Sequence, residues 1–119
     1  MAHYNLGEYL RKEGELDRTI RCWQRAAELE PFFSWPLNGL GNLAVQRGAL
    51  DEARSYYERA IHANVYDAEA HYNYAGLLEE SGQTAEARLH YQAFLKVAPP
   101  KLAHLRPEVQ AKLSQLAPP

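Results

Sequence analysis

Three glycines at a regular spacing constrain the fold of this chain more than any other feature. Gly14, Gly48 and Gly82 lie 34 residues apart. Other positions repeat with the same period: Leu6, Leu40 and Tyr74; Trp23, Tyr57 and Tyr91; Thr19, Ala53 and Ala87. A fixed period of this size is the sequence signature of a repeat protein, in which each repeat is one supersecondary unit. We therefore expect three tandem copies of one unit.

Each period predicts two helices joined by a turn. It contains two amphipathic stretches of about 12 to 14 residues, and the glycine lies between them. Glycine adopts the left-handed backbone conformation that ends a helix without steric cost. Asp17 and Asp51 follow the first two turns, so they should lie near the positive end of the next helix dipole. We expect Thr84 to cap the corresponding helix of the third repeat.

Small and large residues alternate at the predicted helix crossings. The small positions are Gly7, Gly41 and Ala75 in the first helices and Thr19, Ala53 and Ala87 in the second helices, and the large ones are Trp23, Tyr57 and Tyr91. Alternating bulk lets successive layers interdigitate at the density of a protein interior. We therefore expect these residues to form the core.

These positions together resemble the tetratricopeptide repeat. The matching residues are Tyr4-Asn5-Leu6-Gly7, Gly14, Trp23, Ala26 and Pro31; Leu40-Gly41, Gly48, Ala53, Tyr57 and Ala60; and Tyr72, Ala75, Gly82, Ala87, Tyr91 and Pro99. The pattern is an aromatic residue, a leucine-glycine pair, a turn glycine, an aromatic, an alanine and a closing proline; Val65, Phe94 and Thr19 depart from it. The resemblance implies an all-α fold, an α-α superhelix of three helix-turn-helix repeats, with repeats at 1–33, 34–67 and 68–100 of a single domain 1–119.

The two ends of the chain differ. After Pro99-Pro100 the repeat stops, yet Val109, Leu113 and Leu116 keep helical spacing. We expect a capping helix at about 104–117 that covers the apolar face of the last repeat, as solenoid ends require. No equivalent cap precedes the first repeat, and because the chain starts inside that repeat we expect a fragment of a larger protein.

Composition argues against several classes of partner. The formal net charge is -2, from 15 acidic and 13 basic residues, so no overall field attracts nucleic acid or an anionic membrane. No apolar run approaches the roughly 20 residues of a membrane-spanning helix. The single cysteine, Cys22, excludes an internal disulfide. The compartment is left open, with a slight preference for the cytoplasm.

Neither a catalytic constellation nor a metal site is recognisable. The five histidines are scattered over different predicted helices without ligand spacing. His3 and His71 occupy matching repeat positions, which indicates a packing role. Cys22 has no activating base in its sequence context. We therefore expect a protein that is not an enzyme and that uses no metal and no cofactor.

The resemblance also implies a binding surface. In this family the first helix of each repeat lines the inside of the superhelix. The residues that would face a ligand are Tyr4, Asn5, Glu8 and Lys12; Trp35, Asn38, Asn42 and Gln46; and Tyr72, Asn73, Gly76 and Glu80. Rigid rings and carboxamides suit recognition of a peptide, although these residues could also be merely solvated. We expect a protein-protein interaction scaffold or adaptor that holds a peptide or protein segment in its concave groove.

One ligand class is disfavoured. A known groove of this family holds the acidic C-terminal carboxylate of cytosolic chaperones with lysine, asparagine and arginine. Here Gly39 stands where an asparagine would be, and Glu69 and Asn73 stand where lysine and arginine would be. A negative residue would repel a carboxylate, so we predict that acidic chaperone tails do not bind. Together with Glu79 and Glu80, Glu69 indicates a basic or neutral ligand segment near the third repeat.

A second hypothesis is a structural one. Tyr4 and Tyr9 lie near the start of the uncapped first repeat, and exposed solenoid ends are apolar. This repeat could dock another domain or a second copy of the chain, so the alternative function is an oligomerisation module.

Overall fold

The computed structural model describes residues 2–116 and contains seven α-helices and one 3-10 helix in that range, with no strand among those residues. The predicted all-α fold is therefore confirmed. The chain divides into two compact units, Met1–Val65 and Tyr66–Pro119. The single domain 1–119 and the repeat boundaries stay predictions. Within the described range, no helix is both long and apolar enough to cross a bilayer.

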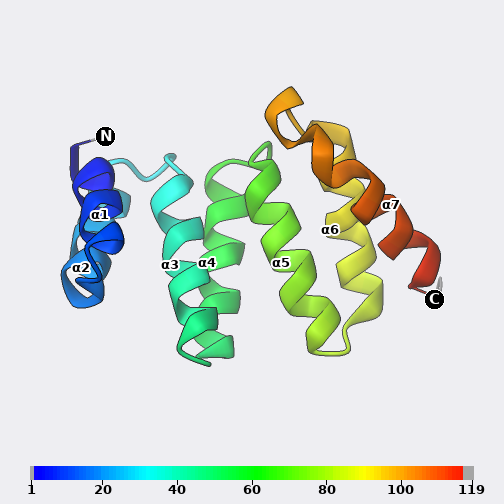
Figure 1. The fold of residues 1–119 in the computed structure, drawn as a ribbon, viewed down its shortest axis with the longest axis horizontal. Helices are drawn as coiled ribbons and strands as arrows, with labels where there is room; N and C mark the ends of the chain where they lie inside the picture. The colour runs from blue at the N-terminus through cyan, green and yellow to red at the C-terminus, as the bar shows by residue number, and fades with distance from the viewer. Residues whose placement is uncertain (1, 117–119) are drawn as a thin grey trace. The chain divides into compact units, whose positions relative to one another are not determined.

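Four helices form the N-terminal unit: α1 (Ala2–Lys12), α2 (Leu16–Leu29), α3 (Trp35–Gln46) and α4 (Leu50–Ala63). Helix α1 pairs with α2, α3 pairs with α4, and α2 also packs against α3 (Figure 1). The core of this unit includes Trp23, Leu40 and Leu43.

The C-terminal unit contains α5 (Ala68–Glu80), α6 (Thr84–Val97), a 3-10 helix η1 (Pro100–Leu105) and α7 (Arg106–Gln115). Helix α5 pairs with α6, and α7 packs against α6 (Figure 1). The terminal helix expected at about 104–117 corresponds to α7, and residue 117 lies outside the described residues. Val109 on α7 is fully buried, as a helix that covers the end of a repeat requires.

The turns follow the predicted chemistry with one exception. The φ angles are 81° at Gly14, 76° at Gly48 and 78° at Gly82, all in the left-handed region. Asp17 and Asp51 lie in the first turns of α2 and α4, as predicted. The prediction that Thr84 caps α6 is wrong. Thr84 is not the cap because α6 begins at Thr84 itself, one residue earlier than a threonine cap at this position needs. The residue at the cap position is Gln83, whose side chain makes no capping hydrogen bond.

Close helix crossings explain the small residues of the N-terminal unit. A methyl group at Gly7 would lie 2.4 Å from Nε1 of Trp23, and one at Gly41 would lie 2.5 Å from Cε1 of Tyr57. A methyl group at Gly39 would lie 2.6 Å from Cζ3 of Trp23. The indole of Trp23 therefore sits between α1 and α3, against glycines of both. The other predicted core residues are almost fully buried: Thr19, Ala53, Ala75, Ala87 and Tyr91.

Candidate functional site

An aromatic cluster lies in the N-terminal unit, with rings from α1, α2, the loop after α2 and the start of α3. Its rings belong to Tyr4, Trp23, Phe33 and Trp35. The Tyr4 ring centroid is 5.8 Å from Trp23, 5.4 Å from Phe33 and 5.7 Å from Trp35, and Phe33 and Trp35 are 5.2 Å apart. Trp23 Nε1 donates a 3.1 Å hydrogen bond to the Tyr4 carbonyl oxygen. Trp23 is 2% exposed and Trp35 is 46% exposed, so the cluster leads from a buried indole through Tyr4 to a half-exposed tryptophan.

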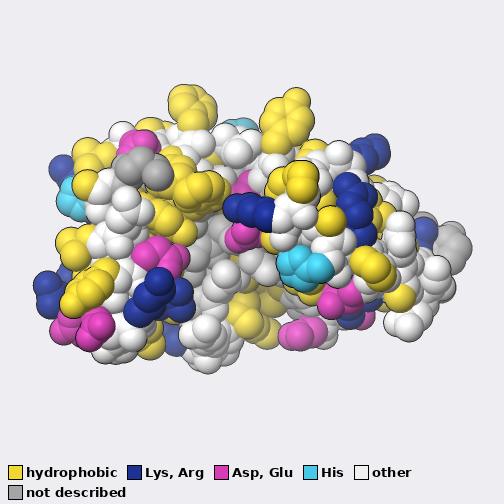
Figure 2. All heavy atoms as spheres, turned by 45° about the horizontal axis from the view of Figure 1, so that its top comes forward, with side chains coloured by type: hydrophobic (Ala, Val, Ile, Leu, Met, Phe, Trp, Pro, Cys, Tyr) yellow, Lys and Arg dark blue, Asp and Glu magenta, His cyan; other side chains and the backbone are white. Residues whose placement is uncertain are grey.

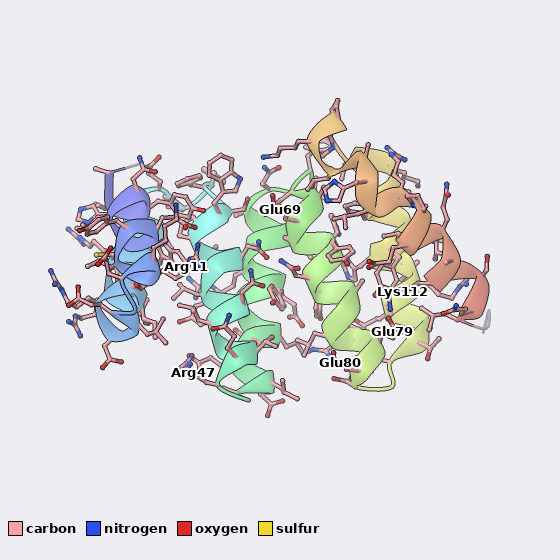
Figure 3. The ribbon with its side chains drawn as sticks, in the orientation of Figure 1. Arg11, Arg47, Glu69, Glu79, Glu80 and Lys112 are labelled. Atoms are coloured by element: carbon pink, nitrogen blue, oxygen red, sulfur yellow. The ribbon has the colours of Figure 1, made fainter. Side chains whose placement is uncertain are left out.

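Next to this cluster, Glu8 is held by two donors. The Tyr4 hydroxyl donates to Glu8 Oε1 at 3.1 Å, and Arg11 Nη2 donates to Glu8 Oε2 at 2.9 Å. Arg11 lies on the side of α1 that faces α3 (Figure 3). The predicted site residue Glu8 is therefore neutralised by an arginine that the sequence prediction did not include. Its signal was available, since Arg11 lies three residues further along the same helix face.

Asn42 on α3 presents a fixed donor. Its Oδ1 accepts a 2.6 Å hydrogen bond from the hydroxyl of Tyr57 on α4. Burial raises the pKa of that hydroxyl, which stays a neutral donor across the physiological range. With Oδ1 engaged, the Nδ2 amide group of Asn42 has no partner among residues 2–116. It is available to donate to a ligand carbonyl.

The remaining predicted residues of this unit differ in exposure. Asn5, Lys12 and Gln46 are exposed. Asn38 is only 6% exposed, so it belongs to the interior more than to the surface. Figure 2 shows hydrophobic side chains at the surface over this unit, with charged side chains between them.

In the C-terminal unit the predicted site residue Tyr72 is bonded to the terminal helix. Its hydroxyl donates to Oε2 of Glu108 on α7. The ring also contacts Phe94, with centroids 5.6 Å apart. Burial, and then the hydrogen bond to the Glu108 carboxylate, raise the pKa of Tyr72 to about 12. Its hydroxyl is therefore occupied within the unit.

Glu79 is occupied in the same way. It accepts a 2.8 Å hydrogen bond from Tyr91 and pairs with Lys112 of α7 at 3.1 Å (Figure 3). Burial first, and then the Glu79 carboxylate, raise the pKa of Tyr91. Glu79 is therefore not an unpaired charge, and the predicted basic ligand segment rests on Glu69 and Glu80 alone. These two residues lie at opposite ends of α5 (Figure 3).

Of the other predicted residues on α5, Asn73 and Gly76 are half-buried and Glu80 is exposed. A methyl group at Gly76 would meet no heavy atom within 4 Å. The surface at Gly76 is therefore open.

The structure also brings together two histidines that sequence reasoning kept apart. Nδ1 of His71 lies 3.0 Å from Nδ1 of His90, and the rings stack with centroids 5.2 Å apart. The signal was the separation of 19 residues, which also joins Tyr4 to Trp23 across a helix pair. Within residues 2–116 no group of three or more histidine, cysteine or acidic side chains is arranged to hold a metal ion.

Comparison with known families decides the membership of the chain. Residues 38–103, more than half of its length, match the model of a tetratricopeptide repeat family. The chain belongs to the tetratricopeptide repeat family. No curated protein sequence matches it.

Solved structures share the tetratricopeptide repeat fold at low identity. The type III secretion translocator chaperone SycD of Yersinia enterocolitica superposes with a TM-score of 0.83 at 20% identity, covering 97% of this chain and 81% of SycD. PcrH in complex with the chaperone binding region of PopD gives 0.82 at 18% identity, covering 97% and 88%. The first TPR of Spaghetti (RPAP3), bound to the HSP90 peptide SRMEEVD, gives 0.77 at 16% identity, covering 95% and 94%. These likenesses establish the helical solenoid fold.

Proposed function

We propose that this tetratricopeptide repeat chain is a protein-interaction module that binds a peptide segment of a partner protein on the first-helix surface of its N-terminal unit. The half-exposed Trp35, whose ring packs against Tyr4 and Phe33, is the observation that carries the proposal. A rigid aromatic side chain gives contact area at low entropic cost, and tryptophan is enriched at binding hot spots.

Asn42 adds direction to this surface. Its Nδ2 group is oriented by the bond between Oδ1 and Tyr57, so it can donate to a peptide carbonyl without first reorganising. Glu8 is neutralised by Arg11, so the surface around the cluster is polar but carries little net charge. This combination suits a segment with one apolar anchor residue and hydrogen-bonding backbone groups.

Proteins of the same fold support the proposal. A SycD structure contains a peptide of the translocator YopD, the PcrH structure contains a region of PopD, and the Spaghetti structure contains an HSP90 peptide. Peptide binding is thus a use of this fold in several proteins, while the partner of this chain has to come from experiment.

The test begins with peptides selected from a random library on the full chain. Trp35→Ala should weaken a selected peptide by about thirtyfold, which corresponds to about 2 kcal/mol for a hot-spot aromatic. Asn42→Asp keeps the oxygen that Tyr57 needs but removes the donor, so it should weaken binding by about fivefold. Binding can be followed by the fluorescence of Trp35, with Trp35→Phe separating its signal from that of Trp23.

Leu89→Ala serves as the control, because Leu89 is 63% exposed on α6 in the other unit. Peptides that bind all variants equally would move the function away from this surface.

Acidic chaperone tails remain a predicted exclusion. An asparagine at position 39 would collide with Trp23, so this chain cannot gain that part of the carboxylate-binding pattern without repacking. Glu69 is exposed and would repel a carboxylate. The labelled peptide SRMEEVD should show no micromolar binding in fluorescence anisotropy; a complex of that strength would refute the exclusion.

A second candidate function is oligomerisation or docking through α1. Leu6 and Tyr9 are 47% and 60% exposed, whereas their equivalents one period later, Leu40 and Leu43, are 2% and 3% exposed. Apolar side chains thus persist at positions that a preceding helix pair would cover.

Light scattering over a concentration series tests this alternative. Self-association that Leu6→Gln/Tyr9→Gln abolishes would support it. A monomer at every concentration would exclude self-association and leave docking of another domain. A complex with such a domain should then be lost in the Leu6→Gln/Tyr9→Gln variant.

A further inference from the structure

A hollow lies in the N-terminal unit and is lined by none of the four rings of the aromatic cluster. It encloses about 660 Å³, within the range of ligand pockets, and is bordered by α2, the following loop, the start of α3 and the last turns of α4. The residues that matter here are Ala27, Pro31, Phe32, Leu37, Arg59 and His62. None of the predicted groove residues lines it.

One wall of the hollow is apolar. Leu37 and Ala27 are 4% and 9% exposed and form its base. Phe32 stands at its edge with 84% of its surface exposed, although a phenyl ring favours burial. An aromatic residue recurs one period later at Tyr66, which is 74% exposed. An exposed ring beside an apolar hollow is characteristic of a binding site.

The opposite wall carries one arginine, Arg59, without a carboxylate partner among residues 2–116. Glu58 borders the hollow but pairs with Arg54, with Nε and Oε1 2.9 Å apart. The Arg59 guanidinium stacks on the Tyr56 ring at 5.5 Å and has no carboxylate partner among the described residues. His62 adds a ring nitrogen in the last turn of α4. After these pairings the unneutralised charge at the hollow is positive, so it complements a carboxylate.

We propose that this hollow binds an acidic segment of a partner protein, with one aromatic side chain of the segment against Phe32 and Leu37 and a neighbouring carboxylate paired with Arg59. The apolar base selects the ring, and the guanidinium over Tyr56 offers the acid several donors. This site is separate from the surface around Trp35, so the two can succeed or fail independently.

A pair of matched peptides tests the proposal on the full chain. The probes are acetyl-Asp-Asp-Trp-Asp-Asp-amide and its counterpart in which every aspartate is asparagine. Nuclear magnetic resonance titration of the isotope-labelled chain reports both the site and the affinity. The acidic peptide should shift the amide signals of Phe32, Ser55, His62 and Ala63, and it should bind about fivefold more tightly than the neutral one, as one ion pair allows.

Two variants assign the contacts. Arg59→Gln should bring the acidic peptide to the affinity of the neutral one, and Phe32→Ala should weaken both peptides. Both side chains are exposed, so the variants should keep the wild-type circular dichroism and melting temperature. Arg21→Gln is the matched control, because Arg21 is an exposed arginine of the same unit that does not line the hollow.

Equal binding of the two peptides, or no shift at millimolar peptide, would overturn the proposal. Shifts confined to Trp35 and Asn42 would also overturn it, because the peptide would then occupy the first-helix surface instead. If both Arg59→Gln and Arg21→Gln lost the preference for the acidic peptide, the preference would come from the overall charge of the chain and not from Arg59. That outcome would also overturn the proposal.

Discussion

The two units differ in what their side chains bond to. In the N-terminal unit Trp23 and Tyr57 bond to α1 and α3, whereas in the C-terminal unit Tyr72 and Glu79 of α5 bond to the terminal helix α7. Trp23 donates to a backbone carbonyl and Tyr57 to the neutral amide of Asn42. The equivalent residue of the third repeat, Tyr91, donates to the carboxylate of Glu79, which also pairs with Lys112.

The N-terminal unit thus keeps hydrogen-bonding groups and aromatic surface that a ligand could use, whereas the corresponding groups of the C-terminal unit already bond within the unit. In the N-terminal unit the Asn42 amide group remains available, and Trp35 is 46% exposed. In the C-terminal unit α7 takes the hydroxyl of Tyr72 and the charge of Glu79. A terminal helix that stabilises a repeat thus also consumes groups that a ligand could have used.

The largest effect should come from enlarging Gly39 in the N-terminal unit. A side chain there meets the indole of Trp23, which also abuts Gly7 and cannot move aside. Overpacking of this kind costs about 1–3 kcal/mol, so Gly39→Val should lower the free energy of unfolding by that amount. Urea denaturation followed by circular dichroism measures it.

Gly76→Val is the control, because that position is open space in the C-terminal unit. A similar loss in both variants would mean that a larger side chain is costly at either position and that the contact with Trp23 does not set the cost.

The next effect compares the hydroxyls of the two units. Tyr91→Phe removes a hydrogen bond to a carboxylate, and such bonds contribute about 1.5–3 kcal/mol. Tyr57→Phe removes a bond to a neutral amide, which contributes about 0.5–1.5 kcal/mol. The Tyr91 variant should therefore lose more stability in the same denaturation assay. Equal losses of stability in the two variants would show that the charge of Glu79 does not strengthen its hydrogen bond with Tyr91.

A smaller effect of opposite sign is expected at Gly76. The residue lies inside α5, where glycine is less stable than alanine by roughly 0.5–1 kcal/mol, and no atom lies within 4 Å of a new methyl group. Gly76→Ala should therefore raise the free energy of unfolding by about that amount. The same change at Gly41, where Tyr57 lies 2.5 Å from the new atom, should lower it instead.

Much of the fold was predictable because it is periodic. Glycines at a spacing of 34 residues marked the turns, and the small and large positions marked the helix crossings, so local and tertiary signals agreed. Thr84 was misassigned because a one-residue shift of a helix start separates a cap from a first-turn residue.

The candidate site was less predictable, because repeat position says which helix face a side chain is on and not what it bonds to. Tyr72 and Tyr4 occupy matching positions, yet one hydroxyl bonds to Glu108 on α7 and the other to Glu8 on its own helix. The first contact depends on how α7 packs, and no period in the sequence encodes that. The contact of His71 with His90 also joins two helices, and in the sequence only the separation of 19 residues, shared with Tyr4 and Trp23, indicates it.

The last prediction concerns the titration of Tyr72, which leaves stability at neutral pH unchanged and tests the contact with α7 at high pH. Its pKa is about 12 in the folded chain and 10.0 ordinarily, so the native state holds the proton more tightly than the unfolded state does. The stabilisation is complete below pH about 10 and is lost as pH rises toward 12. The free energy of unfolding should therefore fall through this window, and part of that fall should be absent in Tyr72→Phe.

Glu108→Gln separates the two causes of this raised pKa. Removal of the carboxylate leaves burial as the remaining cause, so the tyrosinate absorbance that Tyr72→Phe eliminates should appear at lower pH in the Glu108 variant, still above the ordinary value. An unchanged titration would mean that α7 does not hold the Tyr72 hydroxyl in solution. The Tyr72 hydroxyl would then be available to a ligand, and the contrast between the two units would rest on the pairing of Glu79 with Lys112 alone.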